Sequence, residues 1–172
     1  LLYVGRLIKH KNCDFLVDIM ELASGHSKNW KLTIIGIGPF ETRLRELVRE
    51  KNLEECIKLK SNVSEIELME HYSTSDVFVF PSQREGYGIS VAEAISHKLP
   101  VIVYDCPENA ATSLVQTRAS GLKVKNLETS VWFAAIEEIL LNKDSKQLQS
   151  QVKIAKWESI ATEYSKFLNS LM

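Results

Sequence analysis

Short, almost uninterrupted apolar runs separated by amphipathic segments most constrain the fold of this sequence. The clearest runs are residues 32–35, 77–80 and 101–104; a further run occurs at 1–4 and a weaker one at 56–59. Because the clear runs are continuous rather than alternating, they predict strands that are buried on both faces. Such strands belong to a parallel sheet that is covered by helices.

The segments between these runs have the apolar period of helices. One apolar face lies between the first two strands and another between the second and third. These faces comprise Phe15, Leu16, Ile19, Met20 and Ala23, and then Leu44, Leu47 and Val48. Ser64 and Glu67 form a capping box at the start of a further helix. Residues 86–97, 128–141 and 146–171 are also expected to be helical.

Alternating strands and helices predict an α/β fold, a Rossmann-like open parallel sheet with helices on both faces. At 172 residues, one domain over 1–172 is expected, with a C-terminal helical segment at 145–172. The chain begins directly in a strand with Leu1 and no initiator Met. We therefore expect it to be part of a longer protein.

The charge balance excludes some classes of protein. The chain has 21 Lys+Arg and 22 Asp+Glu, a net charge of -1, which argues against a strongly basic nucleic-acid binder. No apolar run approaches the roughly 18 residues that a membrane span needs. The cysteines Cys13, Cys56 and Cys106 are widely spaced and predict free thiols in a reducing, cytoplasmic compartment. No Cys/His cluster has metal-ligand spacing, so no metal site is predicted.

Glycines mark the carboxyl ends of the predicted strands. Five of the seven follow strands one, two and four, namely Gly5, Gly36, Gly38, Gly86 and Gly88. In open parallel sheets, ligands bind at this edge, where the strand order reverses. If the order is 3-2-1-4-5, the loops after strands one and four converge on one ligand.

The loop after strand one contains two cations, Arg6 and Lys11. A guanidinium fork and a flexible ammonium suit a phosphate or diphosphate. The alternative is a solvated loop with ordinary surface cations.

The loop after strand four pairs carboxylates with a glycine turn. Gly86, Tyr87 and Gly88 lead into a helix, whose free N–H groups favour an anion. Glu85 and Glu93 flank this turn eight positions apart, and carboxylates are strong acceptors for sugar hydroxyls. The alternative for each glutamate is a solvated surface residue.

The Gly36-Ile37-Gly38 motif begins like a dinucleotide fingerprint, but Glu41 stands where the third glycine would be. We interpret these glycines as mainly structural, with Gly38 also able to close the crevice.

Taken in order, these motifs, together with Leu99-Pro100-Val101-Ile102, resemble the carboxyl-terminal half of a GT-B-fold retaining glycosyltransferase of glycosyltransferase family 4. The resemblance covers about residues 1 to 141, and its specific part is the pair of glutamates with the glycines between them. Family members often have a Gly-Gly pair and an acidic residue after the Pro-Val strand, where this chain has residues 105–111.

The resemblance implies a role for each matching residue. Arg6 and Lys11 would bind the diphosphate of a nucleotide-sugar donor, with Gly5 beside them. Glu85 would bind the transferred sugar and Glu93 the ribose. The backbone from Gly86 through Tyr87 and Gly88 to Ile89 would bind sugar and phosphate, and the loops near Gly38 and Ser61 would flank the base. The final helix, near Trp157, would reach back to the amino-terminal half.

We therefore expect hexose transfer with retention, with Arg6, Lys11 and Glu85 as the catalytic residues and no cofactor or metal. The acceptor, a glycan or a lipid-linked molecule, would bind the absent amino-terminal domain, so the isolated chain should be inactive. The full enzyme would be cytoplasmic and able to associate peripherally with the membrane.

Three alternatives remain open at this point. An oxidoreductase with a nucleotide-binding Rossmann domain would need its glycine fingerprint after strand one. A glycosidase would use Glu85 and Glu93 as acid and base. A non-catalytic binding module would present an acidic cluster at the strand ends, where this chain has Arg6 and Lys11.

Overall fold

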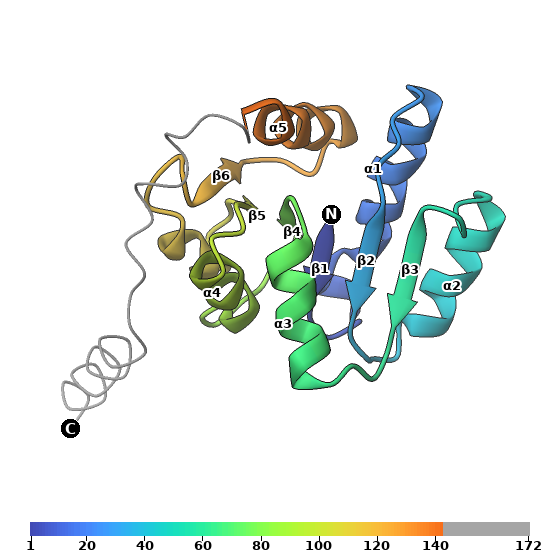
Figure 1. Cartoon of the computed structure of the whole chain (residues 1–172), viewed down its shortest axis with the longest axis horizontal. Coiled ribbons are helices and arrows are strands. Elements are labelled where there is room, and N and C mark those ends of the chain that lie inside the picture. The colour runs from blue at the N-terminus through green and yellow to red at the C-terminus, as the bar shows by residue number, and fades with distance from the viewer. Residues whose placement is uncertain (143–172) are drawn as a thin grey trace.

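The computed structural model describes residues 1–142 as a parallel sheet with helices packed on its faces (Figure 1). The predicted helical segment at 145–172 and Trp157 lie outside the described residues. None of the helices within residues 1–142 has the length and apolar character needed to cross a bilayer.

The sheet has the strand order β3-β2-β1-β4-β5-β6, and all its pairs are parallel. The strands are β1 (Leu2–Val4), β2 (Leu32–Ile35), β3 (Ile57–Lys60), β4 (Phe78–Phe80), β5 (Val101–Tyr104) and β6 (Gly121–Val124). The order 3-2-1-4-5 that the sequence analysis assumed for the first five strands is the observed one, so β1 and β4 are neighbours at the point where the order reverses.

Helices cover both faces of the sheet. They are α1 (Cys13–Gly25), α2 (Glu41–Glu50), α3 (Glu65–Thr74), α4 (Ile89–Ser96) and α5 (Thr129–Asn142), with short 3-10 helices η1 (Lys9–Lys11) and η2 (Ala110–Leu114). The helix α1 packs against α2 and α5, while α4 packs against β4, β5 and η2. The helices α3 and α4 cover the face of the sheet opposite to α1 and α2 (Figure 1).

The helices α1 and α5 pack against each other through large aromatic side chains. Trp132 of α5 is fully buried, and its ring meets that of Phe15 of α1 edge to face, with the centroids 5.6 Å apart. Its indole N–H donates to the backbone oxygen of Asn126 at 2.8 Å. This contact satisfies the polar atom of the buried ring and fixes the entry of the chain into α5.

Several predicted boundaries differ from the structure, and one strand was missed. The strand expected at 56–59 is β3, one residue later. The helix expected at 86–97 begins at Ile89, because Gly88 has a φ of 88°, which no helical residue adopts. The sixth strand, β6, was not predicted. At the capping box, the Ser64 hydroxyl accepts a hydrogen bond from the Glu67 backbone N–H at 3.2 Å, as expected.

Candidate functional site

The loops at the carboxyl ends of the strands are hydrogen-bonded to one another in the same order as the strands. The backbone bonds are Gly36 N to Lys60 O, Leu7 N to Ile37 O, Gln83 N to His10 O and Glu85 N to Glu108 O, each 2.9 Å long. The N–H of Ala110 then donates to Glu85 O at 3.0 Å. The end of β3 and the loops after β2, β1, β4 and β5 therefore form one connected edge, on which side chains distant in sequence meet.

Lys11 and Glu85 bring the loops after β1 and β4 into direct contact. The Lys11 ammonium forms an ion pair with Oε2 of Glu85 and lies 5.4 Å from the centre of the Phe80 ring. Lys11 is only 9% exposed, so this pair is poorly screened by water. The predicted convergence of the two loops is thus observed. However, the two side chains expected to bind different parts of a ligand bind each other in this structure.

Arg6 lies on the same edge and its side chain is exposed. The hydroxyl of the buried Tyr3 donates to the backbone oxygen of Arg6 at 3.3 Å, and the Tyr3 ring stacks on Phe80 with centroids 6.1 Å apart. A Cβ on Gly5 would lie 2.8 Å from the Tyr3 hydroxyl oxygen. Glycine at position 5 therefore lets Tyr3 reach this backbone and leaves the Arg6 guanidinium facing solvent.

The amino terminus of α4 is shaped by Gly88. This residue is the N-cap and offers no side chain to bind the first N–H groups of the helix. A Cβ at this position would lie 2.4 Å from the Cβ of Ala111 in η2, so the close approach of α4 and η2 also requires glycine. Gly86 has open space around it, Tyr87 is half-buried, and Ile89 is 60% exposed. The helix thus presents the positive end of its dipole at the sheet edge.

Glu93 lies in the second turn of α4 and is held by a residue that the sequence analysis did not single out. Its Oε2 accepts a hydrogen bond from the hydroxyl of Tyr72 in α3 at 2.8 Å. Burial, and then the neighbouring Glu93 carboxylate, raise the pKa of Tyr72 far above its usual range. Tyr72 therefore remains a protonated donor at any physiological pH.

The two glycines after β2 have a packing role. A Cβ on Gly38 would lie 2.2 Å from the backbone oxygen of Leu7, and the N–H of Phe40 donates to that same oxygen at 3.0 Å. The structural interpretation of this motif is confirmed, whereas a ligand contact at Gly38 stays a prediction. Nearby, the Ser61 hydroxyl donates to Glu41 Oε1 at 2.8 Å.

Glu41 has a second partner on its own helix. Arg45 binds the same carboxylate at 2.8 Å. Hydrogen bonds from Arg45, and next from Ser61, lower the pKa of Glu41.

Asn109 joins the loops after β4 and β5 and was also missed. Its amide donates to the backbone oxygens of Ser82 at 3.0 Å and Tyr104 at 2.8 Å, and its Oδ1 accepts from Ala111 N at 3.1 Å. The residue is 1% exposed. It therefore fixes the segment that replaces the Gly-Gly pair of the family, and a buried amide with satisfied hydrogen bonds suits that task.

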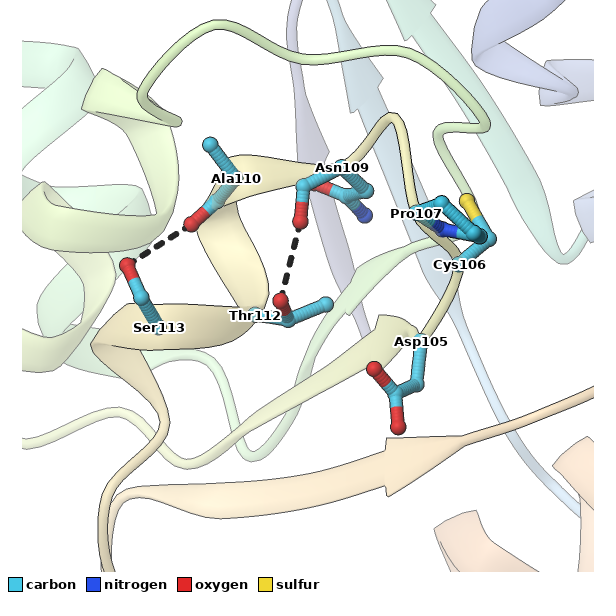
Figure 2. A pocket seen from close by; sticks show the side chains of 7 residues that line it. All are labelled: Asp105, Cys106, Pro107, Asn109, Ala110, Thr112 and Ser113. Atoms are coloured by element: carbon cyan, nitrogen blue, oxygen red, sulfur yellow. Dashed lines mark hydrogen bonds between the residues drawn. The ribbon is translucent and has the colours of Figure 1, made fainter.

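An open hollow of about 530 Å³ lies on the loop after β5 (Figure 2). It is lined by Asp105, Cys106, Pro107, Asn109, Ala110, Thr112 and Ser113. The hydroxyls of Thr112 and Ser113 already donate to the backbone oxygens of Asn109 and Ala110, at 2.9 and 2.8 Å. The Cys106 thiol donates to Gln83 O at 3.1 Å, which links the hollow to the loop after β4.

The cysteines of the described part of the chain are all free thiols, as predicted. Burial raises the pKa of Cys13 to about 11. Within residues 1–142, no three or more His, Cys, Asp and Glu side chains gather closely enough to hold a metal ion.

The whole arrangement matches solved structures that are much longer than this chain. The pneumococcal O-GlcNAc transferase GtfA, in complex with UDP and GlcNAc, superposes with a TM-score of 0.80 at 23% identity, over 98% of this chain and 35% of that one. Sucrose-phosphate synthase from Thermosynechococcus elongatus gives 0.80 at 26% identity, over 99% and 44%. The fold is therefore the Rossmann-like half of a GT-B glycosyltransferase.

The model of the family "Glycosyl transferases group 1" matches residues 1–156, and the chain belongs to this family. The amylovoran biosynthesis glycosyltransferase AmsD of Erwinia amylovora is 30% identical over 160 residues, which are 93% of this chain and 43% of that relative. An uncharacterized glycosyltransferase of Haemophilus influenzae is 26% identical over 76% of this chain and 37% of its own length. The chain thus spans less than half the length of these relatives.

Proposed function

We propose that this chain is the donor-binding part of a retaining glycosyltransferase that transfers a hexose from a nucleoside-diphosphate sugar. The observation that supports this most is the meeting of Lys11 and Glu85 at the edge where α4 presents its amino terminus. Cations and backbone N–H groups suit the diphosphate, and the carboxylates of Glu85 and Glu93 suit the sugar and ribose hydroxyls.

The difficult step of such a transfer is departure of the diphosphate while positive charge grows on the sugar ring. Arg6, Lys11 and the N–H groups of α4 would stabilise the negative charge that develops on the leaving group. In enzymes, one preorganised donor of this kind contributes roughly 3–4 kcal/mol. Glu85 would bind the sugar and stabilise its developing positive charge.

The ion pair gives the donor site a defined resting state. In the proposed complex, Lys11 binds the diphosphate and Glu85 binds the sugar, whereas in this structure the two side chains bind each other. Since a buried unpaired charge is costly, the pair keeps both side chains satisfied before the donor arrives. We infer that, when the donor binds, Lys11 leaves Glu85 and binds the diphosphate, and Glu85 then binds the sugar hydroxyls.

The relatives suggest which donor to test first. The pneumococcal enzyme was solved with UDP and GlcNAc, so uridine nucleotides are the first choice, and the AmsD relative suggests polysaccharide biosynthesis. A glycan or lipid-linked acceptor would bind a second, amino-terminal domain. The full enzyme would work in the cytoplasm or at the cytoplasmic face of the membrane.

Calorimetric titration of the 172-residue chain with uridine, guanosine and adenosine diphosphate sugars tests donor binding. Arg6→Ala and Glu93→Ala should each lower the affinity for the donor at least tenfold, because each removes a charge-assisted contact. Arg49→Ala and Glu70→Ala, on exposed faces of α2 and α3, are the matched controls. If Arg6→Ala and Glu93→Ala bind as the wild type does, the site assignment is wrong.

A second experiment tests the reaction itself. The full-length enzyme should transfer sugar with retention of anomeric configuration, which product NMR reads directly, and should keep its activity in a chelator. We expect little transfer by the 172-residue chain alone. Robust turnover by that chain, or activity that a chelator abolishes and a divalent ion restores, would contradict the proposal.

A further inference from the structure

Tyr72 is a buried polar residue that the proposed reaction does not use directly. It lies in α3, is 2% exposed, and its ring is held from two sides. His97 stacks on it with the centroids 5.3 Å apart, and Phe78 of β4 lies at 5.9 Å. The hydroxyl therefore has a fixed position, and the partner it meets there is the Glu93 carboxylate at 2.8 Å.

The two carboxylates of the site are held in different ways. Glu85 is bound by an ammonium, which compensates its charge. Glu93 is bound by a neutral hydroxyl, which fixes the carboxylate but leaves its full negative charge available. A carboxylate has about four acceptor positions, so one bond from Tyr72 leaves room for two ribose hydroxyls.

The backbone of the same turn is also fixed. The ring nitrogen Nδ1 of His97, the residue directly after α4, lies 2.9 Å from the backbone oxygen of Glu93. The ring that stacks on Tyr72 thus also contacts the backbone of the residue that Tyr72 binds. Tyr72 therefore restrains the carboxylate of Glu93, and His97 restrains its backbone.

We propose that Tyr72 is a positioning residue that orients Glu93 for the ribose and so sets how strongly the site distinguishes ribose from deoxyribose. This inference rests on the proposed donor site. A carboxylate that already has the correct orientation loses less rotamer freedom when the ribose binds. Tyr72 therefore acts on the nucleotide through Glu93, without touching it.

The test compares uridine diphosphate with 2′-deoxyuridine diphosphate by calorimetry on the 172-residue chain; if the donor screen selects another base, the corresponding pair replaces them. Tyr72→Phe keeps the stacked ring and removes only the hydroxyl. We expect it to weaken the ribonucleotide about three- to tenfold and to weaken the deoxynucleotide less, because the deoxynucleotide offers Glu93 only its 3′-hydroxyl. The binding of the deoxynucleotide that remains also shows that the variant is folded. In a Glu93→Ala background, which removes the acceptor of the Tyr72 hydroxyl, Tyr72→Phe should change neither affinity further.

Ile136→Val is the matched control. Ile136 is fully buried in α5, so the substitution should lower the stability of the protein without changing a residue of the proposed site. It should leave the ratio of the two affinities unchanged. If Tyr72→Phe weakens both nucleotides equally, or neither, the positioning role is refuted while the donor site stands. If the wild type binds no nucleoside diphosphate, the proposed function itself fails.

Discussion

Replacing Gly88 with alanine tests whether the close approach of α4 and η2 determines the shape of the site. The backbone of Gly88 has a φ of 88°, and a left-handed conformation of this kind costs an alanine roughly 1–2 kcal/mol. The new Cβ would lie 2.4 Å from the Cβ of Ala111. Because neither Cβ can rotate away, the backbone must move, and overpacking of this sort costs typically about 1–3 kcal/mol.

Together these terms predict that Gly88→Ala lowers the free energy of unfolding by roughly 2–5 kcal/mol. For a chain of this size, each kcal/mol shifts the melting temperature by about 2–4 °C. Thermal unfolding should therefore show a decrease of about 4–20 °C. The proposed donor should also bind more weakly, since the N–H groups of α4 are displaced.

Gly86→Ala is the matched control, because a Cβ at Gly86 would meet nothing within 4 Å. It should change stability by no more than about 0.5 kcal/mol. Adding Ala111→Gly to Gly88→Ala removes the contact between the two Cβ atoms but not the backbone strain. The double variant should therefore be more stable than the sum of the single effects predicts. If Gly88→Ala melts like the wild type, the reasoning about this contact is wrong.

Three further predictions concern the charges and thiols of the chain. Lys11→Met leaves Glu85 without its ion-pair partner in a largely buried position, so urea unfolding should show a loss of about 1–3 kcal/mol; an unchanged midpoint would contradict the burial argument. The folded-state pKa of Glu41 lies below its ordinary value of 4.5, so its contribution to stability is present above pH 4.5 and is lost as the pH falls through the folded pKa. Glu41→Gln should therefore flatten the decline of the urea midpoint in acid, and an identical acid decline in both proteins would refute this. Burial raises the pKa of Cys13 to about 11, so a thiol reagent at neutral pH should modify the half-buried Cys106 first and Cys13 only on unfolding; the reverse order, read by mass spectrometry, would contradict the structure.

The first five strands could be predicted because they depend on features that the sequence displays directly, whereas their order was assumed. Continuous apolar runs such as 77–80 identify buried strands, and the glycines after them mark the carboxyl edge of the sheet. The sixth strand, β6, is less apparent because it contains the exposed Lys123 and lies at the end of the sheet order. The late start of α4 was missed because a glycine pattern does not reveal which glycine has a positive φ.

The candidate site could be predicted only as a meeting of loops. Which side chains contact each other depends on distances that no local pattern encodes, so the direct pairing of Lys11 with Glu85 was not foreseen. Tyr72 was not singled out, since its hydroxyl partner Glu93 is 21 positions away. Asn109 was overlooked because the bond from its amide to Ser82, 27 positions away, depends on how the fold places the two loops.

The hydrogen bonds between successive loops have a consequence for engineering this molecule. Each loop shares backbone bonds with the next, from Gly36 and Lys60 at one side to Glu85 and Ala110 at the other. A loop transplanted alone from a relative would leave its neighbours with unmatched donors and acceptors. The four linked loops after β2, β1, β4 and β5 should therefore be exchanged as a block, and single-loop chimaeras should unfold more easily than either parent.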